Sequence, residues 1–182
     1  GLRFDGVTQS LVDCGDTTII DGATKISVEA IIQPETKQSG FTAGIVTIVG
    51  KSKAAACFNL GLDPDYNVLF KVGSATATSS ALTVGKVYHV VGTYDGATLS
   101  IFINGNLNGT ATLASYTIPD TTDHLSIGQG LGAGPSYSSY GFAGNIYRAR
   151  LWNKSLSQTD VTASYESASL DFADQWGEQN LV

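Results

Sequence analysis

One segment of the sequence, residues 85–105, constrains the fold more than any other. It reads GKVYHVVGTYDGATLSIFING and contains two turn signals, Asp-Gly at 95–96 and Asn-Gly at 104–105. Both pairs adopt positive φ angles at little cost, so they are typical of tight β-hairpins. Residues 98–103 alternate between apolar and polar side chains, and similar strand-like residues precede the first turn and follow the second. The segment therefore predicts a meander of antiparallel strands.

Period-two alternation and β-rich runs predict further strands on both sides of this meander. The expected strands cover 2–4, 10–14, 25–32, 45–49, 57–62, 68–72, 76–83, 125–128 and 142–152. The strand over 25–32 places Ile26, Val28, Ala30 and Ile32 on one face. One short helix is expected over 157–165, because its first residue is a serine that can cap the N-terminus.

Length and composition indicate a single all-β domain. A chain of 182 residues can bury a sizeable core, and only 14% of its residues are charged while 21 are glycine. The net charge is −6 and no basic cluster occurs, which argues against a nucleic-acid partner. No apolar run is long enough to span a bilayer, so we expect no membrane insertion. Because the chain contains no Met, we expect it to be a piece of a longer protein.

The two cysteines, Cys14 and Cys57, both fall in strand-like segments. They could pair across the sandwich or remain separate as small hydrophobic residues, and the sequence alone leaves both alternatives open.

Several short motifs, taken in order, resemble one family. They are Leu2-Arg3-Phe4-Asp5-Gly6, Val12-Asp13-Cys14-Gly15, Ile26-Ser27-Val28-Glu29-Ala30 through Pro34, Tyr88-His89-Val90 through Thr93-Tyr94-Asp95-Gly96, Ile103-Asn104-Gly105, and Phe142-Ala143-Gly144-Asn145-Ile146 through Arg150-Leu151-Trp152-Asn153 with Leu156-Ser157. Their order is similar to that of the concanavalin A-like lectin/glucanase superfamily, in particular its laminin G-like (pentraxin-like) jelly-roll domains.

The resemblance implies a two-sheet antiparallel jelly-roll sandwich with one short helix near the C-terminus. We expect the domain to cover residues 1–170 and residues 171–182 to form a tail or linker. Members of the family mostly bind glycans or protein surfaces, often as modules of larger extracellular, cell-surface or virion-surface proteins. The same location is expected here, although a fold by itself does not fix a function.

The family often carries a structural calcium ion, and two residues match its ligand positions. Asp5 is expected to be retained as a carboxylate ligand, and Asn145 could add a neutral oxygen. Calcium prefers six to eight oxygen ligands. The aspartate that the family usually has in the last long strand is replaced here by Tyr147, so this carboxylate ligand is missing. Calcium is therefore expected as a cofactor whose set of ligands is incomplete.

Enzymatic readings find little support in the sequence. A glycoside hydrolase, which some related sandwiches are, needs two carboxylates flanking the scissile bond. The glutamates, Glu29, Glu35, Glu166 and Glu178, are dispersed, so we expect no catalytic residues and read Glu29 as a sheet-face residue. Gly50-Lys51-Ser52 resembles the end of a P-loop, but the glycine spacing is wrong and no helix pattern follows.

Two groups of residues are the candidate ligand contacts. Tyr137 and Tyr140, with Ser136, lie in the loop GPSYSSYG, which has no core-packing reason to hold two tyrosines, although both rings could instead fold onto the rim of the sandwich and hold the loop. The second polar cluster, with one ring, consists of Asp63, Asp65, Tyr66 and Asn67, although turn chemistry also explains it. Aromatic rings stack on the apolar faces of sugars, and polar side chains bind the hydroxyls.

The sequence thus favours a non-catalytic, lectin-like carbohydrate-binding or adhesion module whose partner is a glycan or a cell-surface polysaccharide. The main alternative is a structural module that binds protein only, such as a tail-fibre or surface component of a virion. A glycoside hydrolase is the third and least supported reading.

Overall fold

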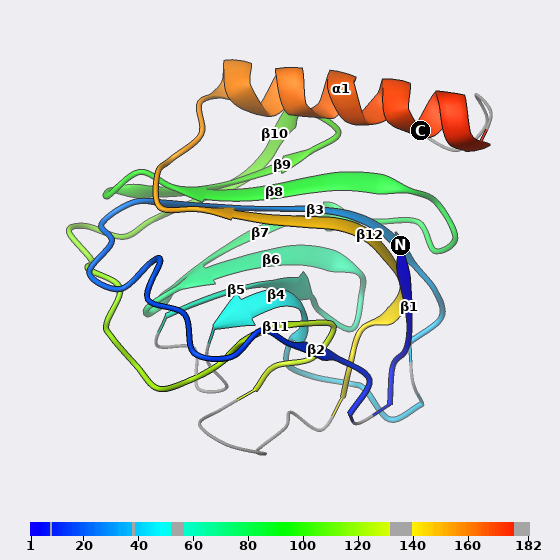
Figure 1. Cartoon of the computed structure of the whole chain (residues 1–182), viewed down its shortest axis with the longest axis horizontal. Coiled ribbons are helices and arrows are strands. Elements are labelled where there is room, and N and C mark those ends of the chain that lie inside the picture. The colour runs from blue at the N-terminus through cyan, green and yellow to red at the C-terminus, as the bar shows by residue number, and fades with distance from the viewer. Residues whose placement is uncertain (8, 38, 52–56, 132–139, 177–182) are drawn as a thin grey trace.

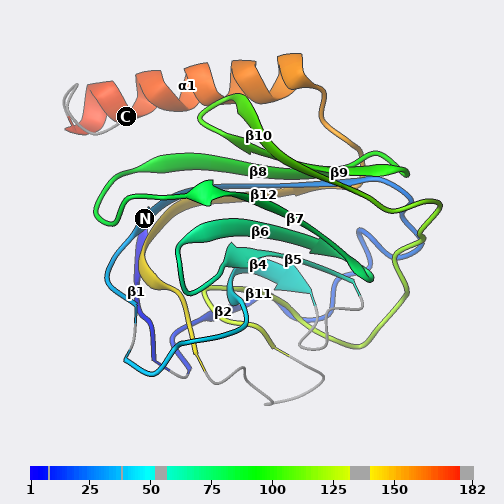
Figure 2. The same cartoon turned by 180° about the vertical axis from the view of Figure 1, so that it is seen from behind.

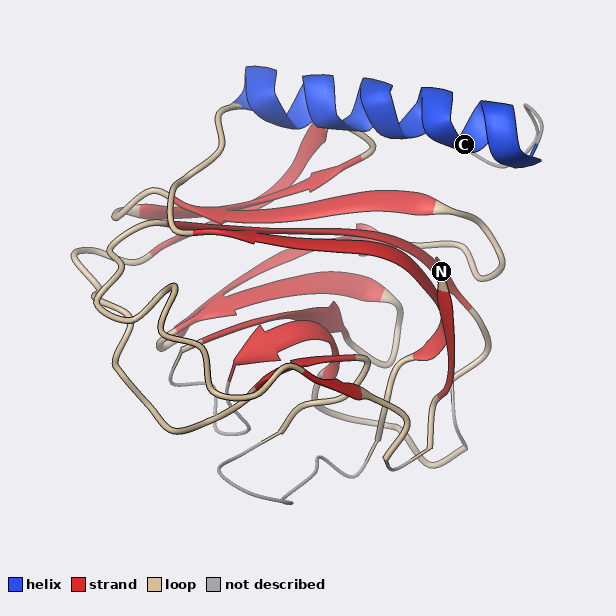
Figure 3. Ribbon diagram, viewed as in Figure 1, coloured by secondary structure: helices blue, strands red, loops and turns tan. Residues whose placement is uncertain are grey.

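The computed structural model describes residues 1–7, 9–37, 39–51, 57–131 and 140–176. Two antiparallel sheets of six strands each pack face to face, and one helix lies on the outer face of one sheet (Figure 1, Figure 3). The predicted two-sheet jelly-roll sandwich is therefore confirmed.

Sheet A contains the first and the last strand of the chain and the three strands of the predicted meander. Its order is β1 (Leu2–Asp5), β12 (Ala143–Trp152), β3 (Ile26–Pro34), β8 (Tyr88–Tyr94), β9 (Thr98–Ile103) and β10 (Asn106–Thr112). The strands β8, β9 and β10 pair consecutively, as the turn signals predict.

Sheet B contains the remaining strands. Its order is β2 (Val12–Asp13), β11 (Leu125–Ile127), β4 (Val46–Lys51), β5 (Phe58–Leu62), β6 (Asn67–Val72) and β7 (Ala75–Ala81). The weakly alternating segment near 76–83 forms the edge strand β7 of sheet B, and this edge lies against β10 of sheet A, where the Ser80 N–H donates to the Asn108 side chain at 2.8 Å.

The main core lies between the inner faces of the sheets. The predicted face of β3 (Ile26, Val28, Ala30 and Ile32) is fully buried there. Gly92 in β8 lets the opposite sheet approach, since a Cβ at this position would lie 2.4 Å from the Phe70 ring. The inner side chains therefore set the distance between the two sheets.

The helix α1 (Gln158–Trp176) covers the face of sheet A that points away from sheet B, as both views show (Figure 1, Figure 2). Val161 packs with Val91 and Phe102, and Ala168 packs with Ile31. The central strands of sheet A are therefore buried on both faces. Among the described residues, no helix is long and apolar enough to cross a membrane.

The helix differs from the sequence-based expectation. It is much longer than 157–165 and runs through residue 176, inside the segment expected as a tail. Neither glycine nor proline interrupts residues 166–176, so nothing in the local sequence ends the helix.

The cysteines are both free: Cys14 is exposed and Cys57 is buried. The Sγ of Cys57 lies 3.4 Å from the hydroxyl of Thr121. Of the two alternatives, Cys57 therefore follows the second, a small buried residue that does not pair with Cys14.

A buried lysine fixes the loop between β2 and β3. The Lys51 side chain, at the end of β4, is fully buried, and its Nζ lies 2.9 Å from Asp16 Oδ1 and 3.0 Å from Asp21 Oδ1. It also donates to the carbonyl oxygen of Thr17 at 2.6 Å. Burial alone would lower the pKa of Lys51, but the hydrogen bonds to both aspartates outweigh it, and the pKa is raised. Lys51 thus anchors this loop by ion pairs.

Replacing Lys51 by methionine should destabilise the protein. The variant keeps the side-chain volume but leaves Asp21 without its cation, and breaking a buried ion pair costs about 3 kcal/mol. Urea unfolding of the Lys51→Met variant against the exposed control Lys86→Met measures the difference. Equal unfolding free energies for the two variants would show that the buried ammonium does not hold this loop.

Candidate functional site

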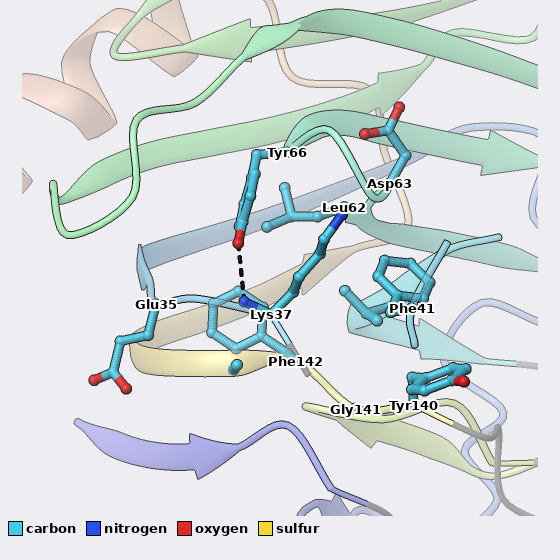
Figure 4. Close-up of a pocket in the computed structure, with 11 residues that line it drawn as sticks. Glu35, Lys37, Phe41, Leu62, Asp63, Tyr66, Tyr140, Gly141 and Phe142 are labelled. Atoms are coloured by element: carbon cyan, nitrogen blue, oxygen red, sulfur yellow. Dashed lines mark hydrogen bonds between the residues drawn. The ribbon is translucent and has the colours of Figure 1, made fainter. Parts of the chain in front are cut away.

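A small pocket lies at one end of the sandwich, where three loops meet (Figure 4). Its floor consists of buried apolar side chains that also belong to the main core, namely Phe41, Val46, Leu62 and Phe142. Its rim carries Glu35, Lys37, Asp63, Tyr66 and Tyr140. The free volume is about 10 Å³. This is the space of about one water molecule.

The loop after β3 and the turn between β5 and β6 hold one side of the rim. The backbone N–H of Lys37 donates to the Tyr66 hydroxyl at 2.9 Å (Figure 4). Tyr66 has a φ of 64°, a backbone conformation that is unusual for a bulky residue. Such strain persists only where surrounding contacts enforce it, and it is common at binding sites. The ring of Tyr66 is thus fixed in place.

Tyr140 holds the other side of the rim. Its hydroxyl donates to the carbonyl oxygen of Gly40 at 3.0 Å, and its ring packs against Phe41 with centroids 5.4 Å apart and planes tilted by 51°. Tyr140 is half-buried, so one part of the ring faces solvent.

Lys37 crosses the rim between the two tyrosines. Its Nζ donates to the carbonyl oxygen of Pro64 and lies 6.0 Å from the centroid of the Tyr66 ring. The ammonium group makes no ion pair with a described residue. An ammonium carries three N–H donors, so two remain for a ligand.

The acidic residues of the rim are already engaged. Glu35 accepts two hydrogen bonds from the Arg3 guanidinium, at 2.7 and 3.2 Å. The Asp63 carboxylate accepts from the backbone N–H groups of Asp65 and Asn67 and from the Asn67 side chain. The carboxylates of Glu35 and Asp63 both point away from the floor residue Phe142 (Figure 4).

The two candidate ligand groups therefore converge in part. Tyr66 and Tyr140, predicted in separate clusters, line the same pocket. Asp65 is exposed and does not line the pocket. Asn67 does not line it either, and its side chain donates to Asp63 within the turn. Ser136 and Tyr137 lie outside the described residues. Sequence reasoning missed Lys37, because a single lysine in a polar loop gives no pattern that would mark it.

The proposed calcium ligands lie on the outer face of sheet A. Asp5 pairs with Ala143, and Asn145 lies two residues further along β12. The Asp5 carboxylate accepts the Val7 N–H at 3.1 Å, and the Asn145 amide donates to Gln33 at 3.1 Å. Among the described residues, no group of three or more His, Cys, Asp or Glu side chains could hold a metal ion. Asp5 and Asn145 alone fall short of the ligand number that calcium prefers.

A buried charged cluster lies between sheet A and α1. Glu29 and His89 are both fully buried, with 3.6 Å between Glu29 Oε2 and His89 Nε2. Arg148 lies 3.0 Å from Glu29 Oε1, and the hydroxyl of Ser164 on α1 donates to Glu29 Oε2 at 2.7 Å. The His89 ring packs against that of Tyr165, 5.8 Å between centroids.

The charge state of Glu29 follows from these contacts. Burial alone would raise the pKa of Glu29, but the contacts with His89, Ser164 and Arg148 outweigh it, and the pKa is lowered. Glu29 is a sheet-face residue, as expected, and it is an ionised group covered by the helix.

Comparisons with known proteins agree with this architecture. A family model described as the concanavalin A-like lectin/glucanases superfamily matches residues 6–162. A heptameric SAP-like pentraxin from Limulus polyphemus is similar in structure, with a TM-score of 0.68 and 16% identity over 90% of this chain and 80% of the pentraxin. No curated protein sequence matches the chain.

Two toxin domains are similar as well. The binding domain of botulinum neurotoxin serotype G gives a TM-score of 0.69 at 13% identity, over 92% of this chain and 42% of that one. The binding domain of paraclostridial mosquitocidal protein 1 gives 0.65 at 13% identity, over 91% of this chain and 43% of that one. The chain thus spans less than half the length of either toxin domain, and these identities show a shared fold only.

Calcium at Asp5 and Asn145 stays a prediction, which calorimetric titration with calcium chloride can test. If the ion binds there, the heat of binding seen with the wild-type protein should disappear in Asp5→Asn, because this change removes the carboxylate charge that calcium needs. Asp120→Asn, an exposed change outside these residues, is the control. Absence of binding heat with the wild type would remove calcium from consideration.

The Glu29 cluster predicts a specific loss of stability in acid. Because the folded pKa is lowered, the contribution of Glu29 is complete above the ordinary glutamate pKa of about 4.3. It is lost as the pH falls through the folded pKa. Glu29→Gln should lose about 3 kcal/mol at pH 7, because it removes the carboxylate that faces the Arg148 guanidinium.

Urea unfolding at several pH values checks this, with the exposed Glu166→Gln as the matched control. The acid-dependent decrease should be smaller in Glu29→Gln than in the control. A decrease of the same size in both variants would assign the acid sensitivity to other groups.

Proposed function

Because the chain belongs to the concanavalin A-like lectin/glucanase superfamily, we propose that it is a non-catalytic carbohydrate-binding module whose ligand contacts the rim of the pocket. One observation carries the proposal: Tyr66 and Tyr140, far apart in the sequence, lie on the two sides of the same pocket. Pairs of partly exposed aromatic rings at a concave surface suit the apolar faces of sugar rings, while nearby donors suit the hydroxyls.

The positions of the acidic residues support a binding role over hydrolysis. Glycoside hydrolysis needs two carboxyl groups that flank the scissile bond, about 5 to 9 Å apart. At the pocket, the Glu35 carboxylate is held by Arg3, and Asp63 is held by its own turn. Glu29 is fully buried under α1 and cannot reach a substrate. The described acidic residues at the rim, Glu35 and Asp63, therefore stabilise loop conformations.

We further propose that the module serves adhesion as a part of a larger extracellular, cell-surface or virion-surface protein. The support is general: two proteins of similar structure are the binding domains of toxins. A surface glycan or polysaccharide is the partner that fits the aromatic rim.

The proposal predicts that the protein binds at least one glycan class on a glycan array. Tyr140→Ala should then weaken the best interaction roughly tenfold, because a stacked aromatic contact contributes on the order of 1 kcal/mol. Tyr140→Phe keeps the ring and should bind normally. Tyr116→Ala removes a half-buried tyrosine outside the pocket and controls for general effects on stability.

Two results would overturn the proposal. Absence of binding to every glycan, with and without calcium, leaves a protein-binding module as the better reading. Release of shortened sugars from a bound glycan would establish an enzyme instead.

A further inference from the structure

The pocket floor is too small for a sugar ring and has room for one group of about the size of a water molecule. The cavity of about 10 Å³ is closed below by Phe41, Val46, Leu62 and Phe142, which are all at least nine-tenths buried. This floor presents only carbon atoms of apolar side chains, so a polar group that entered it would lose its hydrogen bonds to water. A ligand can therefore insert only a small apolar substituent.

The rim places hydrogen-bond donors directly above this floor. The Tyr66 hydroxyl accepts the Lys37 N–H and donates to none of the described residues. The Lys37 ammonium has donors left after its bond to the Pro64 carbonyl. The carboxylates of Glu35 and Asp63 are engaged elsewhere and turned away (Figure 4). The free polar groups at the rim are therefore donors, and they fit a ligand that presents an acceptor.

A methyl group bonded to a carbonyl combines these two requirements. We propose that the pocket recognises the acetyl group of an acetamido sugar, with the methyl group on the apolar floor and the carbonyl oxygen accepting from the Tyr66 hydroxyl. The sugar ring then lies on the rim against Tyr140. This inference rests on the proposed carbohydrate-binding function and adds the chemical class of the ligand.

The proposal predicts a preference that matched sugars measure. The β1,4-linked trimer of N-acetylglucosamine should bind at least about tenfold more tightly than the β1,4-linked trimer of glucose, a difference of about 1.4 kcal/mol. The N-propionyl analogue adds one methylene and should bind about tenfold more weakly than the acetyl form, because the floor has no room for it. Titration calorimetry of the full chain gives all three dissociation constants.

Two variants assign the preference to the pocket. Val46→Ile fills the floor and should remove the preference, because it weakens binding of the acetylated trimer more than binding of the glucose trimer. Val12→Ile, a half-buried valine on β2, is its control. Tyr66→Phe removes the donor and should reduce the preference several-fold. Tyr88→Phe is its control, because the Tyr88 hydroxyl likewise accepts a backbone N–H, that of Thr83 at 3.0 Å. Thermal unfolding shows that each variant is folded.

The outcomes separate the two proposals. Equal affinity for the acetylated and glucose trimers, or array binding confined to sugars without acetyl groups, overturns the acetyl inference and leaves carbohydrate binding intact. A preference that persists in Val46→Ile also overturns it, since the acetyl group would then bind elsewhere. Binding of no glycan at all overturns both.

Discussion

The packing of the two inner sheet faces against each other is the interaction on which the rest of the structure depends. Phe142, Val46 and Leu62 belong to this core and also form the pocket floor. The site is therefore positioned by the most rigid part of the molecule, and the loops have only to bring side chains to its rim. A binding site built in this way needs little ordering when a ligand arrives, which favours affinity.

Sheet A is unusual because its second face is covered too, and that interface contains charges. Glu29, His89 and Arg148 are enclosed by α1, although apolar side chains of similar volume could fill such a space at a lower desolvation cost. We interpret the cluster as a device for orientation: Ser164 on α1 donates to Glu29 Oε2, and this bond favours one register of the helix on the sheet. The charged residues belong to the scaffold, away from the pocket.

Much of the fold was predictable because its signals are local. The turns at 95–96 and 104–105 gave the meander, and alternation along β3 identified the buried face correctly. The length of α1 was missed although it carries a local signal, since Val161, Tyr165, Ala168, Phe172 and Trp176 recur at helical spacing through the end of the helix. The role of Lys51 was also hidden, because its aspartate partners lie about 30 residues away and a strand-end lysine has no period that reveals a partner.

The sequence by itself determined the class of fold, the strands and the absence of a recognisable catalytic motif. It also pointed to Tyr66 and Tyr140 as separate candidates. Only the tertiary structure decided that these two rings share a pocket, that Lys37 lies between them, and that Glu29 is enclosed. The physical reason is that alternation and turn propensities act over a few residues, whereas a binding site depends on strand order and loop conformation, which bring distant residues together.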